Sequence, residues 1–252
     1  MNVQLFCVAH RQPSVQLPEG VCTLGVNDYK SATYFTGSGN NINEKNSRYS
    51  EVSAIYWLLN NPCAAFEQAD FVGICHYRRF FYSSDVQASV RPGSASIQNE
   101  QFSLIRNSCS AKSLGIYLKD SDCIAPQPID LRRSLLQFYN EKHLQAGRDL
   151  KLAYEEGLTR GLWTQAFSEE QLHRETRLSP FCMSVLRKDR FITLWTAIME
   201  VLLAIEPQVS QPRDAYQQRN MGFIAERLHS SAVAWQNSQG MPVQRLSVVQ
   251  VG

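Results

Sequence analysis

The stretch DFVGICHYRRFF (residues 70–81) decides the fold, because a core strand in it runs straight into a polar cluster. Residues 71–75 form a short apolar run, which is typical of a strand buried on both faces of a sheet. The next four residues, His-Tyr-Arg-Arg at 76–79, are called the HYRR block. An imidazole, a phenol and two guanidiniums are therefore expected at the carboxyl end of a buried strand.

Short apolar runs alternate with helical patterns along the rest of the chain. This alternation predicts an α/β domain with a mainly parallel central sheet flanked by helices. Strands are predicted at 3–9, 71–75, 114–118, 181–186 and 244–251, helices from about 46 to Pro62, over much of 131–172, at 191–205 and at 216–229, and a long loop at 83–111.

Polar residues follow three of the predicted strands. His10 comes after the first strand, the HYRR block after the second, and Asp120–Asp122 after the run at 114–118. In parallel sheets, ligands bind beyond the carboxyl ends of the strands. These three groups are therefore expected to converge on one edge of the sheet.

Length and composition describe an ordinary globular protein. The chain has 252 residues, and its size predicts a single domain over 1–252 with a helical insertion at about 131–172. A net charge of +2 gives no sign of nucleic-acid binding. The seven cysteines show no metal-binding spacing, and the first residues lack the pattern of a secretory signal. We predict a cytoplasmic protein with reduced thiols; peripheral contact with the inner membrane and the oligomeric state stay open.

The HYRR block has two interpretations. The first is a strand end that has reached solvent, where basic side chains are simply hydrated. The second is an anion site, because each guanidinium offers a planar fork that matches phosphate oxygens. Such a charged hydrogen bond contributes about 1.5–3 kcal/mol. Arg78 and Arg79 would then hold a diphosphate without a metal cofactor.

The segment Asp120-Ser121-Asp122 contains a D-x-D pattern. Sugar-nucleotide transferases often use this pattern to hold a divalent metal on the donor diphosphate. The pattern is also common by chance, so a structural turn and a single catalytic carboxylate stay open as alternatives.

The loop SGNNINEKN (residues 38–46) lacks the spacing of the known phosphate-binding loops. A turn with Asn and Gly in left-handed conformations explains much of it. However, Asn41, Lys45 and Asn46 precede a predicted helix, and the amino end of a helix favours anions. These three residues are therefore candidate ligands for an anion.

The last predicted helix carries a polar face with aromatic residues. Tyr216, Arg219, Phe223 and Glu226 share one side, opposite an apolar stripe. An ordinary solvated face is one interpretation. The aromatic side chains suit the wall of a pocket better than open water.

The loop at 38–46, the HYRR block and the last helix together resemble a bacterial polysaccharide-biosynthesis family, domain of unknown function 4422. The segments VAHR (8–11) and DCIAP (122–126) also resemble family segments. Asn40, where the family has Asp, and Ser179–Phe181 depart from the pattern. The matching residues are Gly39, Asn41, Ile42, Lys45, Asn46, Glu51, Tyr56, Trp57, Asn60 or Asn61, Gly73, His76, Tyr77, Arg78, Arg79, Phe81, Tyr216, Arg219, Gly222, Phe223, Ala225, Glu226 and Arg227.

The resemblance implies a glycosyltransferase with a variant of the Rossmann-like, GT-A-like nucleotide-sugar fold. It implies a UDP-sugar donor, with UDP-galactofuranose the leading candidate, and a surface glycan or lipid-linked glycan of the capsule or O-antigen type as acceptor. In related folds a D-x-D motif stands where this chain has the HYRR block. The analogy suggests that cationic side chains replace the metal.

The resemblance also suggests roles for the candidate residues. Arg78 and Arg79, with Arg219 as a third candidate, would stabilise the leaving diphosphate. Asp122 is the first candidate for the catalytic base and Glu226 the second. The nucleotide would be held by His10, Arg11, Asn41, Lys45, Asn46, His76 and Tyr77, with Glu51 and Tyr216 as structural support. A non-catalytic nucleotide-sugar or glycan-binding module is the main alternative, and a phosphoesterase using His76 is weaker.

Overall fold

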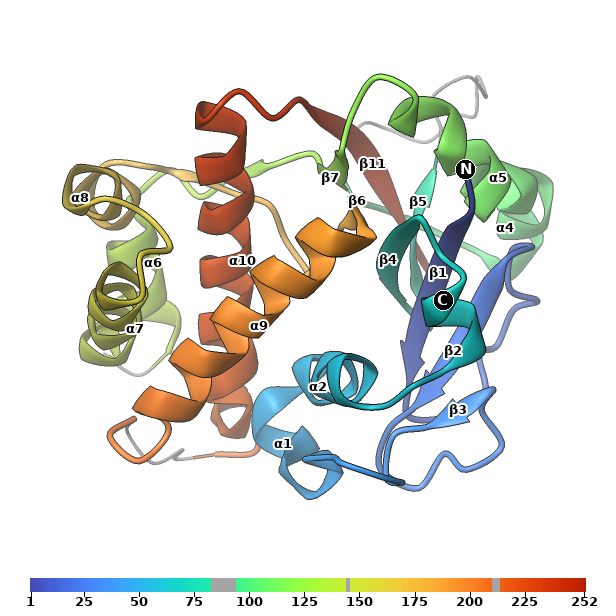
Figure 1. Ribbon diagram of the computed structural model, residues 1–252, viewed down its shortest axis with the longest axis horizontal. Helices are drawn as coiled ribbons and strands as arrows, with labels where there is room; N and C mark the ends of the chain where they lie inside the picture. The colour runs from blue at the N-terminus through green and yellow to red at the C-terminus, as the bar shows by residue number, and fades with distance from the viewer. Residues whose placement is uncertain (83–93, 144–145, 210–213) are drawn as a thin grey trace.

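The computed structural model describes residues 1–82, 94–143, 146–209 and 214–252. Within these ranges, a central sheet is covered by helices on both faces (Figure 1). Its strands follow the order β10-β7-β11-β5-β4-β1-β2-β3, with β6 added on β11, and β8 and β9 pair separately. The strands are β1 Val3–Ala9, β2 Val21–Gly25, β3 Tyr34–Phe35, β4 Phe71–His76, β5 Arg79–Tyr82, β6 Ser94–Ile97, β7 Cys123–Pro126, β8 Ile129–Asp130, β9 Arg177–Leu178, β10 Val185–Arg187 and β11 Val243–Val251.

The helices differ widely in length. The longest, α9 and α10, cross one face of the sheet (Figure 1). The α-helices are α1 Asn46–Tyr49, α2 Val52–Asn60, α3 Ala64–Glu67, α4 Asn99–Ile105, α5 Ala111–Gly115, α6 Leu135–Lys142, α7 Gly147–Thr159, α8 Gln165–His173, α9 Lys188–Ile205 and α10 Asn220–Ser238, and 3₁₀ turns lie at Asn43–Lys45, Arg106–Cys109, Ile116–Leu118 and Gln217–Arg219.

The sheet is mixed and not clearly parallel, so the prediction of a mainly parallel sheet is confirmed only in part. Strand β1 pairs in parallel with β2 and β4, whereas β5 is antiparallel to β4 and β11. The reversal occurs inside the HYRR block, where residues 77 and 78 turn the chain and Arg79 pairs with His76. The predicted α/β class with flanking helices is confirmed; the Rossmann-like assignment and the single domain stay predictions.

Side chains of the central strands alternate between two apolar cores. Phe6 and Ile74 pack with α2, α9 and α10 on one face, while Leu5 and Cys75 pack with α4 and α5 on the other. Alternate residues of a strand point to opposite faces, so a strand covered on both sides must be apolar throughout. This two-sided burial explains the uninterrupted apolar run at 71–75.

Several predicted elements match the structure closely. Strand β1 spans the predicted residues, and α9 and β11 contain their predicted runs. The predicted helix at 216–229 is found as a 3₁₀ turn at Gln217–Arg219 followed by α10, which starts at Asn220. The helical pattern over 131–172 corresponds to α6, α7 and most of α8. Of the described helices, none has both the length and the apolar character needed to cross a membrane.

Three predicted elements are wrong. Residues 114–118 are helical, because Ser110 caps α5 by accepting a hydrogen bond from the Ser113 N–H, and a 3₁₀ turn continues it. The predicted loop at 83–111 contains β6 and α4; its residues 83–93 lie outside the described residues. In the run 181–186, only the last two residues belong to a strand.

Candidate active site

The carboxyl ends of β1 and β4 bring the first predicted groups together. The two strands are parallel neighbours, with Val8 aligned to His76. The ring of His10 meets the Tyr77 ring edge-on at 4.8 Å between centroids. The guanidinium carbons of Arg11 and Arg78 lie 5.7 and 5.0 Å from the Tyr77 ring centroid. We call His10, Arg11, Tyr77 and Arg78 the Tyr77 cluster.

Electrostatics in the Tyr77 cluster favour an anion. Burial lowers the pKa of His10, and the charges of Arg11 and Arg78 lower it further. The Nε atom of Arg78 is buried, and no described residue accepts its hydrogen bond. A neutral imidazole beside two guanidiniums leaves this cluster with net positive charge.

A second cluster lies beside the first, around the start of β5. Its members are His76, Arg79, Glu51, Arg219 and Glu226, and we call it the Arg79 cluster. Because Arg79 pairs with His76 across the β4–β5 hairpin, both side chains leave the same face of the sheet. Burial lowers the pKa of Arg79, the charges of Glu51 and Glu226 oppose that effect, and the charges of Arg78 and Arg219 add to it, so these groups lie within electrostatic range of Arg79.

His76 is neutral and serves as a hydrogen-bond donor. Burial, followed by the charge of Arg79, lowers the pKa of His76 to about 4. Its Nε2 lies 2.8 Å from the carbonyl oxygen of Phe181. A carbonyl only accepts, so Nε2 carries the proton and Nδ1 does not.

Arg79 is fixed in place by two contacts. Its Nε donates to Gln250 Oε1 at 3.1 Å, and its guanidinium carbon lies 4.4 Å from the centre of the Phe181 ring. Burial lowers the pKa of Arg79, although an arginine of this kind stays charged at neutral pH. The side chain is therefore a preorganised, partly desolvated cation.

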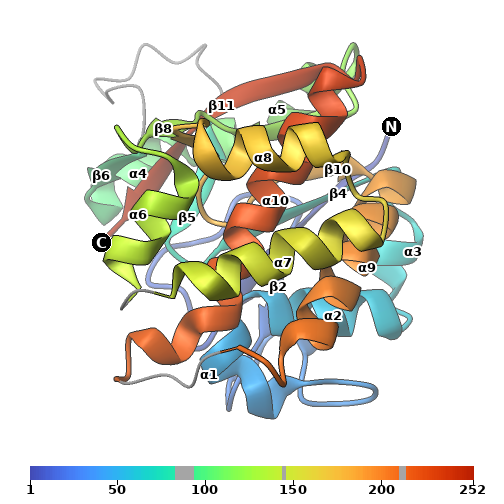
Figure 2. The ribbon, with the colours of Figure 1, turned by 90° about the vertical axis from the view of Figure 1, so that its left-hand side faces the viewer.

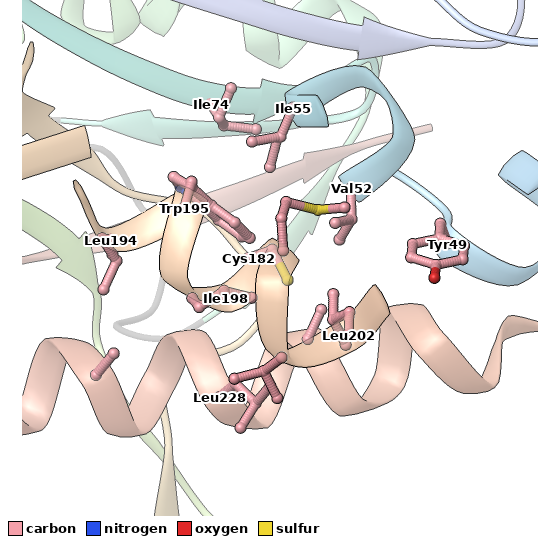
Figure 3. Close-up of a cluster of buried hydrophobic side chains, with 14 of the residues drawn as sticks. Tyr49, Val52, Ile55, Ile74, Cys182, Leu194, Trp195, Ile198, Leu202 and Leu228 are labelled. Atoms are coloured by element: carbon pink, nitrogen blue, oxygen red, sulfur yellow. The ribbon is translucent and has the colours of Figure 1, made fainter. Parts of the chain in front are cut away.

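The segment Phe181-Cys182 holds this arrangement through strained backbone. Both residues have positive φ, at 76° and 52°, and each such residue costs about 1–3 kcal/mol. The Phe181 carbonyl accepts from His76, and its N–H donates to Glu226 Oε1 at 2.7 Å. Cys182 lies in the core among Val52 and other apolar side chains (Figure 3). Contacts on both sides therefore compensate the strain.

The two carboxylates of the Arg79 cluster differ in their surroundings. Burial raises the pKa of Glu51 against the opposing effects of Arg219, Arg79 and a hydrogen bond from the Cys182 thiol. Glu226 instead uses both oxygens, since Oε1 accepts from Phe181 and Oε2 accepts from the buried Arg227 at 2.6 Å. Glu51 is thus the better proton acceptor, and Glu226 fixes the backbone.

Arg219 reaches the Arg79 cluster from the start of α10. Its Nε donates to Ser50 Oγ at 3.0 Å, and its guanidinium carbon lies 5.5 Å from the Phe223 ring centroid. Ser50 has a φ of 53°, and its carbonyl accepts from Asn46 Nδ2 at 2.7 Å. Asn46 therefore positions Ser50, and Ser50 positions Arg219.

Replacing Gly222 with alanine is expected to destabilise the fold by about 1–3 kcal/mol. An added Cβ would lie 2.8 Å from Ser50 Oγ and 3.3 Å from the Tyr49 carbonyl oxygen, so α10 must move away from Ser50. Denaturant unfolding measures the loss. Gly115→Ala is the matched control, because its Cβ would meet only flexible side-chain ends at 3.3 Å or more. Equal stability of both variants would contradict this packing argument.

Two of the other predicted residues do not join either cluster. Asp122 precedes β7, and since β7 runs parallel to β11 and pairs antiparallel with β10, this residue lies at the edge where β4 begins. There its carboxylate contacts Arg187 at 3.5 Å. Lys45 forms an ion pair of 2.9 Å with Glu206, which neutralises its charge. The expected convergence of Asp120–Asp122 with His10 and the HYRR block is therefore wrong.

Two further predicted residues, Asn41 and Tyr216, make their contacts outside the charged groups of both clusters. Asn41 stabilises its own loop, with Nδ2 donating to the Gly39 carbonyl and Oδ1 accepting from the Asn43 N–H. Tyr216 is 57% exposed, and its ring lies 5.0 Å from that of Phe223. Among the described residues, no group of three or more His, Cys, Asp and Glu side chains is placed to hold a metal ion.

Sequence reasoning missed three participants. Phe181 contributes its ring and both backbone groups, Gln250 bonds to Arg79, and Ser50 bonds to Arg219. None of them stands next to a recognisable motif except Ser50, which directly precedes Glu51. A positive φ at a residue other than glycine leaves no local signal in the sequence.

Comparison with known proteins places this geometry in a family. The apo structure of the WbbM bifunctional glycosyltransferase matches with a TM-score of 0.87 at 21% identity, over 100% of this chain and 46% of that one. The match shows a common fold, and this chain spans less than half the length of that protein. No curated protein matches. The domain of unknown function DUF4422 matches residues 4–237, and the chain therefore belongs to that family.

Proposed function

We propose that the protein is a glycosyltransferase that moves a sugar from a UDP-sugar to a glycan or lipid-linked glycan acceptor. The observation that carries this proposal is Arg79, which pairs with His76 at the carboxyl end of β4, is fixed by Gln250 and Phe181, and lies within electrostatic range of two carboxylates and a second guanidinium. The fold shared with part of a protein described as a bifunctional glycosyltransferase adds support. UDP-galactofuranose is the donor that the family resemblance favours.

The side chains of the two clusters suit the diphosphate and the nucleotide of such a donor. In the transfer, the bond between the anomeric carbon and the diphosphate breaks, and negative charge grows on the departing oxygens. Cations that are already in place stabilise that charge without reorganisation. Arg79, together with Arg78 and Arg219, would contact the diphosphate, and the rings of His10 and Tyr77 would flank the nucleotide.

Glu51 takes the place of Asp122 in the proposed chemistry. An inverting transfer needs a base that removes the proton from the acceptor hydroxyl while its oxygen attacks the anomeric carbon. Asp122 lies at the opposite edge of the sheet, and Glu226 already accepts two hydrogen bonds. A carboxylate with a raised pKa, such as Glu51, takes up a proton more readily.

Turnover of a UDP-sugar by the purified protein is expected to persist in EDTA, because side-chain cations stabilise the diphosphate. Initial rates of UDP release, measured with and without chelator, test this. Loss of activity in EDTA with recovery on adding Mn²⁺ would contradict the arginine proposal and point to a metal, with Asp120 and Asp122 as candidate ligands.

A non-catalytic binding module is the second candidate. It is favoured by the partial coverage of the matching bifunctional protein, of which this chain spans 46%. The side chain of Asn40, which stands where the family usually has Asp, has a structural contact, since its Oδ1 accepts a hydrogen bond from the Tyr56 hydroxyl at 3.2 Å. Calorimetry that detects UDP binding, together with no transfer or hydrolysis across a panel of acceptors, would support the module.

A further inference from the structure

A polar cavity of about 490 Å³ is bounded by α8, α10 and the start of β11 (Figures 1 and 2). Its wall includes Gln127 and Pro128, which directly follow β7. Strands β7 and β4 both run antiparallel to β10, so their carboxyl ends lie at the same edge of the sheet. In α/β sheets, ligands bind beyond the carboxyl ends of the strands. The cavity therefore lies at the same edge as the HYRR block.

A short segment connects this cavity with the Arg79 cluster. The Ser179 N–H donates to Ser230 Oγ at 2.9 Å, and both residues line the cavity. Two residues later, the Phe181 N–H donates to Glu226 Oε1 at 2.7 Å. Ser230 and Glu226 are one turn apart on α10, which is about 6 Å along the helix axis. The cavity thus begins one helical turn from a carboxylate of the Arg79 cluster.

Arg245 carries an uncompensated charge in the cavity wall. Its Nη1 donates to the Pro126 carbonyl at 3.2 Å and to Ser179 Oγ at 2.5 Å. Its Nε and Nη2 have no acceptor among the described residues, and neither atom is sealed inside the protein, because the half-buried side chain lines the cavity. Burial lowers the pKa of Arg245, the Cys123 thiol opposes this effect, and the charge of Arg177 adds to it. No described carboxylate pairs with this guanidinium, which stays charged at neutral pH.

The other charges of the wall balance each other. Arg177 and Glu175 form a two-point ion pair, with Nε to Oε1 at 3.1 Å and Nη2 to Oε2 at 3.4 Å. A ligand therefore meets a net positive charge at Arg245, whose two available nitrogens form part of a planar fork. Carboxylate and phosphate groups carry the matching charge and accept such a pair of hydrogen bonds. The cavity therefore favours an anionic group.

The neutral part of the wall suits a sugar better than a bare ion. Gln127 Nε2 donates to the Arg245 carbonyl, and Gln171 Oε1 accepts from the Ser231 hydroxyl. Gln127 Oε1 and Gln171 Nε2 have no partner among the described residues, so an acceptor and a donor are left for sugar hydroxyls. The partly exposed ring of Phe167 adds an apolar surface. The volume lies within the range of about 300–1,000 Å³ that is usual for small-molecule sites.

We propose that this cavity binds an acidic sugar, a sugar unit that carries a carboxylate or a phosphate group. The anionic group would pair with Arg245, and hydroxyls of the ring would pair with Gln127 and Gln171. If the protein transfers sugars, this unit belongs to the acceptor, and that assignment alone rests on the proposed function. The binding itself does not depend on transfer.

Binding of glucuronate, galacturonate and glucose 1-phosphate, measured by calorimetry and ligand-observed NMR, tests this site and distinguishes carboxylate from phosphate. At least one of them is expected to bind with a Kd at least about ten-fold below that of glucose or galactose. Arg245→Gln should raise that Kd about ten- to a hundred-fold, the equivalent of one charged hydrogen bond. Ala234→Phe, which fills the cavity from a partly exposed position on α10, should abolish binding while Arg245 stays in place. The Tm of each variant shows whether the fold survives.

Controls separate this site from the catalytic proposal. Arg174→Ala removes an exposed arginine that directly follows α8, and Arg79→Ala removes a cation of the neighbouring cluster; both should leave the Kd unchanged. Equal binding of acidic and neutral sugars, or a Kd that Arg245→Gln and Ala234→Phe do not change, would overturn the inference. Inorganic phosphate that binds as tightly as any acidic sugar would overturn the assignment to a sugar. A Kd that depends on Arg79 instead of Arg245 would overturn the location. None of these outcomes decides whether the Arg79 cluster transfers sugars.

Discussion

Arg79→Ala is expected to lower kcat/KM for transfer from a UDP-sugar by about ten- to a hundred-fold. A charged hydrogen bond contributes about 1.5–3 kcal/mol, and each 1.4 kcal/mol is a factor of ten. Since the diphosphate gains charge as it leaves, much of the loss should appear in kcat rather than in the KM for donor. Steady-state kinetics with varied donor measures both.

Two variants make this result specific. Arg79→Lys keeps the charge but loses the planar fork, so it should recover only part of the activity. Arg174→Ala removes an exposed arginine that pairs with Glu170 on α8 and should change neither constant. Because Arg79 also contacts Gln250 and Phe181, the Tm of each variant is needed to show that the fold survives. An unchanged kcat/KM in well-folded Arg79→Ala would contradict the anion site and favour the interpretation of the HYRR block as a strand end with hydrated side chains.

The position of the HYRR block was predictable from the sequence, but the roles of its two arginines were not. The five-residue apolar run at 71–75 is consistent with a buried strand, and the charged residues that follow it mark where that strand ends. The turn at Tyr77 and Arg78 has neither Gly nor Asn, the residues that normally mark a two-residue hairpin. Only the pairing of Arg79 with His76 shows which arginine joins the two carboxylates.

The misplacement of Asp122 has a similar physical origin. The run at 114–118 is too short for periodicity to separate a strand from a helix, and Ser110 caps a helix there. Because residues 114–118 do not form a strand, Asp122 follows no strand and instead directly precedes β7. An error in one element thus moved a predicted catalytic residue to the opposite edge of the sheet.

The strained segment at Phe181 was beyond prediction from sequence alone. Its apolar run is typical of a strand, and no Gly or Asn marks the two positive φ values. The partners that stabilise it, His76 and Glu226, lie 105 and 45 residues away in the chain. Tertiary contacts of this kind override local preference, and backbone strain is often found at functional sites.

Glu51→Gln is expected to lower kcat by about 10²–10⁴-fold, the usual contribution of general base catalysis. The amide has almost the same shape as the carboxyl group but cannot take the proton from the acceptor hydroxyl. Donor binding, measured as the Kd for UDP, should stay within a few-fold of the wild-type value. Single-turnover rates at saturating donor and acceptor isolate the chemical step from product release.

The pH dependence of kcat gives an independent test. Glu51 acts in its ionised form, so kcat should fall as the pH drops through the pKa of Glu51. Because burial raises that pKa, the fall should begin at a higher pH than an ordinary glutamate would give. His76 has a pKa of about 4, so its protonation also changes the charge of the site at the acidic end of this pH range. The part of the fall that Glu51→Gln removes therefore belongs to Glu51.

Stability separates a base from a structural carboxylate. A raised folded-state pKa means that ionised Glu51 is less stable in the fold than in the unfolded chain, a penalty that is present above the folded pKa and lost at low pH. Glu51→Gln should therefore keep or raise the Tm at neutral pH while losing activity. Glu226→Gln should instead lower the Tm, because an amide nitrogen would face either Arg227 or the Phe181 N–H. The reverse pattern, with activity lost only in Glu226→Gln, would transfer the role of base to Glu226.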